Sequence, residues 1–248
     1  MASNNEHNQK WDSYVLLLDE YKQMFLVPRL ANSKKYLSKL SDLIIEYTEI
    51  KHKYVETLFL EAPSYNIFEI LGVQRNEVRT HSAFLCHLLS PQASHGQGFL
   101  FLQSFLEFCA KKYPDNFPQI PSFEEINSLD WFVAKEVTSQ FGRMDILLQN
   151  PNSGFLCVIE NKIDALEGEN QLSRYWDWII EHENIFPNNV LLYLTINGDT
   201  SKTSKGKNYL PLSYRKDILF WLTSTIERIK PQSVKEVVRQ YAGIIQKF

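Results

Sequence analysis

The sequence has no long apolar run, and none of its segments approaches the roughly 18–20 consecutive apolar residues that a membrane-spanning helix needs. The first ten residues are polar and contain no apolar core of a signal peptide. These absences argue against a membrane protein and against export, so we expect a soluble, cytoplasmic protein without a membrane partner.

Cysteine is also scarce. Cys86, Cys109 and Cys157 each lie in an apolar run, which predicts reduced, buried thiols and neither a disulfide framework nor a zinc site. No glycine-rich phosphate loop follows a strand-like segment, and the pattern GxxxxGK[ST] is absent. The chain is therefore a poor candidate for a nucleotide-dependent transferase or a dinucleotide-binding dehydrogenase.

The sequence has no large excess of either charge. Its 26 Lys and Arg against 29 Asp and Glu give a formal net charge of −3, so binding to nucleic acid must come from a local patch. The clearest basic run is residues 202–216, which includes Lys202, Lys205 and Lys207 and contains no acidic residue. It fits phosphate contact and a solvated loop equally well.

What the sequence does contain is a clear succession of periodic segments, which divides it into a helical N-terminal extension, residues 1–65, and a second domain, residues 66–248. Helical spacing of apolar residues predicts helices over residues 11–26, 33–60, 76–89, 99–112, 169–183, 216–229 and 232–247. Strand-like runs occupy residues 131–138, 144–149, 155–160, 190–196 and 209–212. This order predicts an α/β or α+β core.

Two of the strand-like runs carry charged residues at matching ends. The turn at residues 151–154 separates residues 144–149 from residues 155–160 and predicts an antiparallel hairpin. In that hairpin Asp145 and Glu160 lie opposite each other, and opposed residues are roughly 4.5–5.5 Å apart. Lys162 is two residues beyond Glu160 and points to the same face.

Two carboxylates this close repel each other, and a hard divalent cation such as Mg²⁺ relieves that repulsion. Such a cation lowers the pKa of a bound water and neutralises charge on a phosphodiester, while Lys162 can stabilise the anion that forms. A salt-bridged Glu-x-Lys pair on a sheet face is the structural alternative. The apolar strand that ends in these charges favours a functional site.

Asp145, followed by Glu160-Asn161-Lys162, resembles the Asp…(Asp/Glu)-x-Lys signature of the PD-(D/E)XK nuclease superfamily, with Met144 in the place of the signature's proline. The surrounding residues 142–146 and 159–163 resemble a bacterial branch with uncharacterised members. Residues 171–175 are similar to the Gln-x-x-x-Tyr motif on the helix after the catalytic hairpin. The resemblance implies a restriction-endonuclease-like core, a central mixed sheet flanked by helices, with a helical N-terminal extension.

The resemblance also implies roles for individual residues. It implies a catalytic set of Asp145, Glu160, Lys162, Glu77 and Gln171. It implies a metal held by Asp145, Glu160, the backbone carbonyl of Asn161, and Glu77. Mg²⁺ is the expected cofactor, with Mn²⁺ as a substitute. Contacts to nucleic acid are expected from His81, Tyr175, Lys202, Lys205 and Lys207. For Glu77 and His81 the alternatives are a helix-dipole glutamate and a surface histidine; for Tyr175, core packing.

The leading hypothesis is thus a metal-dependent nuclease that cleaves DNA more readily than RNA, with analogy to restriction, phage defence or repair. One alternative is a nucleic-acid-binding or sensing module that keeps the fold without cleaving. Another is an interaction protein in which residues 33–60 recruit a partner. A homodimer stays open, because no segment identifies a dimer surface.

Overall fold

The computed structural model describes the chain except for residues 1–10, 21–23, 25–32, 63 and 124–126. The chain divides into two compact units, Met1–Tyr65 and Asn66–Phe248. Among the described residues, no helix has both the length and the apolar character that crossing a membrane requires.

The first unit is helical. Residues 11–20 form a helix, and α2 spans Ser33–Glu61, which confirms the helix expected over residues 33–60. Residues 21–23 and 25–26 of the expected helix 11–26 lie outside the described residues. The two helices contact each other, because the ring of Trp11 meets that of Tyr47 edge-on, with 5.2 Å between centroids. Tyr14 also donates a hydrogen bond to Glu46 of α2.

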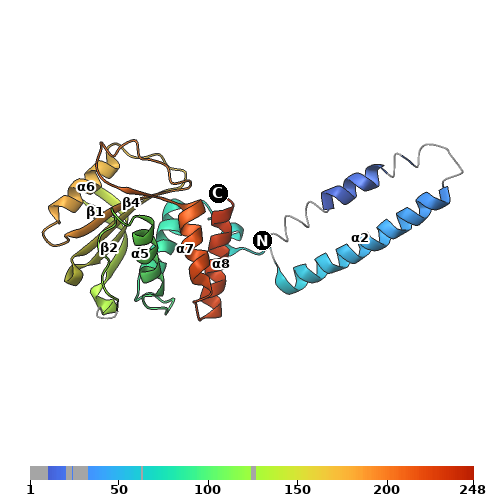
Figure 1. Cartoon of the computed structure of the whole chain (residues 1–248), viewed down its shortest axis with the longest axis horizontal. Coiled ribbons are helices and arrows are strands. Elements are labelled where there is room, and N and C mark those ends of the chain that lie inside the picture. The colour runs from blue at the N-terminus through green and yellow to red at the C-terminus, as the bar shows by residue number, and fades with distance from the viewer. Residues whose placement is uncertain (1–10, 21–23, 25–32, 63, 124–126) are drawn as a thin grey trace. The chain divides into compact units, whose positions relative to one another are not determined.

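The second unit contains the sheet and the remaining helices (Figure 1). Its α-helices are α3 (Ile67–Ile70), α4 (Ala83–Leu89), α5 (Leu100–Lys112), α6 (Gln171–Glu181), α7 (Leu219–Ile226) and α8 (Gln232–Gln246). Two π-helical segments, η2 (Glu77–Ser82) and η5 (Tyr214–Ile218), lead directly into α4 and α7. Short 3₁₀ turns occupy η3 (Ser128–Asp130) and η4 (Pro151–Ser153).

A five-stranded mixed sheet forms the centre of this unit, in the order β1-β2-β3-β4-β5. Its strands are β1 (Phe132–Ser139), β2 (Gly142–Asn150), β3 (Phe155–Lys162), β4 (Asn188–Thr195) and β5 (Leu210–Ser213). The first three strands are antiparallel to one another, whereas β3, β4 and β5 run parallel. The parallel step from β3 to β4 is made through α6, as a crossover connection requires.

Helices cover both faces of the sheet (Figure 1). The alternation of side chains along β3 sends Phe155, Cys157 and Ile159 into a core shared with α4, α5, α7 and α8. Leu156 and Val158 point the other way, into a smaller core with α6. This confirms the expected mixed sheet flanked by helices. Glu160 and Lys162 continue the second series, so they lie on the face that α6 covers.

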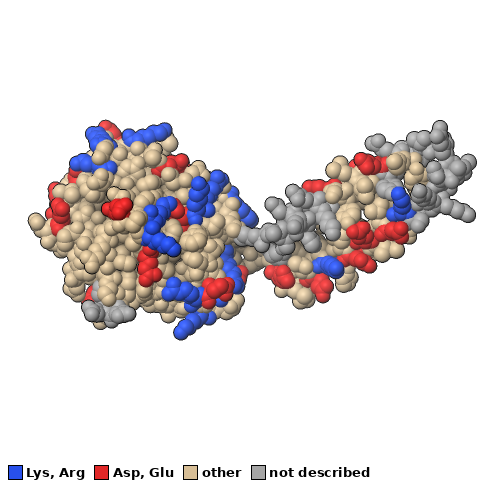
Figure 2. Space-filling view, in the orientation of Figure 1, with Lys and Arg blue, Asp and Glu red and all other residues tan. Residues whose placement is uncertain are grey.

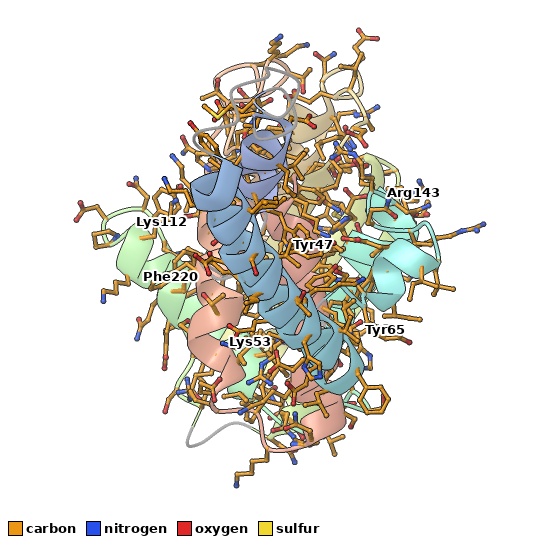
Figure 3. The ribbon with its side chains drawn as sticks, turned by 90° about the vertical axis from the view of Figure 1, so that its right-hand side faces the viewer. Tyr47, Lys53, Tyr65, Lys112, Arg143 and Phe220 are labelled. Atoms are coloured by element: carbon orange, nitrogen blue, oxygen red, sulfur yellow. The ribbon has the colours of Figure 1, made fainter. Side chains whose placement is uncertain are left out.

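The larger core continues to the surface where α5 meets α7. The rings of Phe108 and Phe220 lie 5.8 Å apart, and Lys112 pairs with Asp217 at 2.5 Å. Figure 3 shows Lys112 and Phe220 on the same side of the molecule. On the face of the second unit seen in Figure 2, acidic and basic side chains are interspersed. That mixture agrees with the nearly balanced charge of the whole sequence.

Candidate active site

The β2–β3 hairpin brings the two key carboxylates together. Its register pairs Ile146 with Ile159, so the next residues outward, Asp145 and Glu160, come opposite each other. The predicted antiparallel hairpin is therefore confirmed. The turn forms because Asn150 accepts a hydrogen bond from the N–H of Ser153, and Gly154 adopts the left-handed conformation, with φ of 63°.

Glu160 is buried without full compensation. Its side chain is 0% exposed, and its Oε1 lies 2.5 Å from Nζ of Lys162. No described group donates a hydrogen bond to its Oε2. Asp145 is 6% exposed and accepts a hydrogen bond of 2.8 Å from the N–H of Asn161. A buried carboxylate oxygen without a partner is costly, which points to a cation at this position.

Burial and the repulsion between the two carboxylates also shift the pKa values of these groups. Burial raises the pKa of Asp145 to about 6, although Lys162 and the N–H of Asn161 act in the opposite direction. Burial and then the charge of Asp145 raise the pKa of Glu160 well above its usual value. Burial acts to lower the pKa of Lys162, but the neighbouring carboxylates of Glu160, Asp145 and Glu77 together raise it above its usual value. These three carboxylates therefore favour the charged form of Lys162.

Two further residues from the expected set lie at this end of the hairpin, Glu77 from η2 and Asn161 within β3. Glu77, at the start of η2, places its Oε1 3.6 Å from Nζ of Lys162, and its Oε2 accepts a hydrogen bond of 2.7 Å from the N–H of Ile163. The side chain of Asn161 is fully buried and is held by Ser82 at 3.0 Å and Tyr214 at 2.9 Å. These bonds fix the backbone of Asn161, including its carbonyl.

Gln171 and Tyr175 lie on α6 as expected, but they bond to each other. Nε2 of Gln171 donates to the hydroxyl of Tyr175 at 3.0 Å, and Oε1 of Gln171 accepts from the N–H of Gly168 at 3.0 Å. The hydroxyl of Tyr175 donates to the carbonyl of Arg143 at 2.5 Å. Tyr175 is 1% exposed, so its predicted contact with nucleic acid is corrected to a packing role. Together the two residues brace the start of β2.

His81 lies away from the surface, which corrects both its expected nucleic-acid contact and its alternative as a surface histidine. The side chain is 0% exposed. Its Nδ1 is 2.9 Å from the hydroxyl of Tyr241, and its Nε2 is 3.0 Å from the carbonyl of Gln74. Burial lowers the pKa of His81 to about 4, so the ring is neutral at pH 7. Both ring nitrogens therefore form hydrogen bonds inside the core.

The lysines of the basic run 202–216 lie in different environments. Lys202 lines a cleft that begins at Lys162. Lys207 pairs with Asp177 of α6 at 3.0 Å. Lys205 is exposed and adopts a left-handed conformation, with φ of 51°. Of these three lysines, Lys202 is the one that lines the same cleft as Lys162.

Glu136 of β1 is a further carboxylate near Asp145, and its charge acts to raise the pKa of Asp145. The β1–β2 register pairs Lys135 with Ile146 and Val137 with Met144, which puts Glu136 opposite Asp145. Glu136 has φ of 56°, which interrupts the pairing, and its Oε2 is 3.0 Å from the guanidinium of Arg143. Arg143 stands at the edge of the molecule in Figure 3. From the sequence, the place of Glu136 on a strand-like run fits a carboxylate that supports the metal ligands and a solvent-facing residue equally well.

The donors fit a hard divalent cation. Two carboxylates and a backbone carbonyl form an all-oxygen set, which Mg²⁺ and Mn²⁺ prefer. The unpartnered Oε2 of Glu160 is the observation that supports this fit. In the described part of the chain, no group of three His, Cys, Asp or Glu side chains is arranged to hold a metal. The set would therefore be Asp145, Glu160 and the carbonyl of Asn161, with Glu77 beside Lys162.

Comparison with known proteins supplies independent evidence. A family model described as the PD-(D/E)XK nuclease superfamily matches residues 65–243, which is most of the chain and includes every residue of the site. Curated proteins and solved structures give no match.

Proposed function

The chain belongs to the PD-(D/E)XK nuclease superfamily, and from this premise we propose that it is a metal-dependent nuclease that hydrolyses phosphodiester bonds of DNA. The observation that carries the proposal is the buried, incompletely paired Glu160, opposite Asp145 and within 2.5 Å of Lys162. A purely structural salt bridge would leave no oxygen of a buried carboxylate without a donor.

Each residue of the site has a separate role in the proposed reaction. Asp145, Glu160 and the carbonyl of Asn161 would hold Mg²⁺ or Mn²⁺. When bound, the metal would supply charge neutralisation and a water of lowered pKa. Lys162, whose charged form the neighbouring carboxylates favour, stabilises the negative charge that develops on the phosphate oxygens as water attacks phosphorus. Glu77 orients Lys162 through the 3.6 Å ion pair, and Gln171 and Tyr175 position β2.

The substrate and the setting belong to the same proposal. DNA is preferred to RNA through the resemblance of the motifs, and restriction, phage defence and repair are the roles in which such an enzyme would act. The cytoplasm, where thiols stay reduced, is the proposed compartment, because Cys109 and Cys157 are buried free thiols.

Incubation with linear, circular and single-stranded DNA in Mg²⁺, Mn²⁺ or EDTA tests the proposal. We expect cleavage with either metal, none in EDTA, and a loss of at least about 100-fold in Lys162→Ala, since one stabilising group at a reacting oxyanion contributes this much. Lys235→Ala is the matched control, because Lys235 of α8 forms its 3.0 Å ion pair with the exposed Glu227, which is no part of the site. Cleavage that persists in EDTA or in Lys162→Ala would contradict the proposal.

The competing view is a module that binds nucleic acid without cleaving it. It would be supported if isothermal titration detected no binding of Mg²⁺ or Mn²⁺ to the folded protein while DNA still bound. Binding of metal that disappears in Asp145→Asn would instead favour the nuclease.

A further inference from the structure

A cleft of about 570 Å³ lies beside Lys162. It is on the side of β3 that faces β4, away from β1 and β2. Its walls come from the segment after β3, residues 163–167, and from the end of β4 with the segment that follows it, residues 195–203. Lys162, which pairs with the buried Glu160, also lines this cleft, and its side chain is 11% exposed. Whatever enters the cleft meets the catalytic cation at its inner end.

The walls of the cleft are held in place by one carboxylate, Glu167. It accepts hydrogen bonds from the hydroxyls of Tyr193 at 2.8 Å, Ser201 at 2.8 Å and Thr203 at 2.7 Å. It also accepts from the N–H groups of Lys202 at 3.2 Å and Thr203 at 3.0 Å. These bonds join the two walls. The cleft is thus formed in advance, as ligand sites usually are.

The lining has the chemistry of a nucleotide site. Lys162 and Lys202 supply positive charge for phosphate, and Thr195, Asn197 and Thr200 supply hydrogen-bonding groups. Leu166 is 92% exposed at the rim, where an apolar side chain can pack on the face of a base. Two carboxylates, Glu167 and Asp199, also line the cleft, and their negative charge disfavours a second phosphate there.

The size of the cleft limits what it can hold. A volume of about 570 Å³ lies within the range of single-ligand pockets, roughly 300–1,000 Å³. A base that is stacked and paired inside a duplex cannot enter such a recess unless it is turned out of the stack. An unpaired nucleotide can enter directly.

We propose that this cleft binds one unpaired nucleotide next to the phosphate that is cut, so that the substrate is single-stranded or locally unpaired nucleic acid. The inference rests on the proposed nuclease function and specifies its substrate class. Lys162 contacts the phosphate at the inner end, Lys202 lies along the strand, and Leu166 packs against the base.

Filling the cleft tests the inference. Thr200→Trp places a large side chain on an exposed position of the wall, and Thr223→Trp makes the same change on the exposed surface of α7 as the matched control. Binding of a fluorescein-labelled oligothymidylate is followed by anisotropy in EDTA, beside a duplex of equal length. We expect wild type to prefer the single strand, and Thr200→Trp to weaken that binding about tenfold, because stacking and phosphate contacts of one base contribute this much.

A second variant guards against misfolding of Thr200→Trp. Leu166→Asp changes a side chain that is 92% exposed and puts a negative charge at the rim, so it should weaken single-strand binding by a similar factor. Circular dichroism confirms that each variant is folded. The inference is overturned if wild type binds both forms equally, or if both cleft variants bind like Thr223→Trp.

Failure of the proposed function would look different. Wild type is assayed on bis(p-nitrophenyl) phosphate, a phosphodiester without a nucleotide, in Mg²⁺ or Mn²⁺. No hydrolysis of this ester or of DNA would reject the nuclease, whereas the binding experiment would still decide whether the cleft takes an unpaired nucleotide. Hydrolysis together with equal cutting of duplex and single strand would retain the nuclease and reject the cleft.

Discussion

Several buried side chains in this protein have pKa values far from their usual ones, and the shift of His81 can be measured through the stability of the protein. Burial lowers the pKa of its ring from 6.5 to about 4. The folded state therefore binds fewer protons than the unfolded state between these two pH values. His81 contributes stability that is fully present above about pH 6.5 and is lost as the pH falls towards 4.

We predict that this loss is about 2 kcal/mol in the free energy of unfolding between pH 7 and pH 5. Urea denaturation of wild type and His81→Phe at both pH values measures it. The variant lacks the titrating ring, so its stability should fall less than that of wild type over the same interval. Asp145 titrates with the opposite sign, since its pKa is raised to about 6, and comparison of the two proteins cancels its contribution. Parallel pH profiles would contradict the assignment.

At the scale of elements, the β2–β3 hairpin carries the site, and its turn depends on one glycine. Gly154 has φ of 63°, and a Cβ there would lie 2.9 Å from Cδ of Pro187. Gly206 has φ of 74° with nothing within 4 Å of the added atom. Gly206→Ala therefore measures the conformational cost alone, about 1 kcal/mol.

Gly154→Ala should cost more, about 2–3 kcal/mol, because the clash with Pro187 adds to the left-handed backbone. Urea denaturation of both variants measures the difference. The site should also loosen, because the turn determines the register that places Asp145 opposite Glu160. Equal losses in the two variants would show that Pro187 moves aside freely.

The hairpin also shows what the sequence could and could not predict. Its turn and alternation are local signals, and they were sufficient to put Asp145 opposite Glu160 and Lys162 beside it. The partners of Asn161 were not predictable, since Ser82 and Tyr214 lie 79 and 53 residues away along the chain. His81 was misplaced for the same reason, because its partner Tyr241 lies 160 residues away.

At the scale of the whole molecule, both cores and the site belong to the second unit. The buried apolar clusters run from Leu85 to Ile245, the site residues run from Glu77 to Lys202, and the family match covers residues 65–243. None of the described residues of the first unit belongs to these buried clusters or to the site. The long helix α2 instead carries exposed apolar side chains, such as Ile44, Val55 and Phe59.

We therefore predict that residues 66–248, expressed alone, unfold cooperatively and hydrolyse bis(p-nitrophenyl) phosphate at a rate within about twofold of the full chain, a difference of less than about 0.5 kcal/mol in activation free energy. Thermal unfolding and initial rates measure this. The molecular mass in solution, measured over a range of protein concentrations, then tests whether the first unit self-associates. If α2 self-associates, the mass of the full chain should rise with concentration, whereas the mass of the fragment should stay constant. An insoluble or inactive fragment would show that residues 1–65 are needed for the fold or the chemistry, and the boundary at residue 65 would then be wrong as a domain boundary.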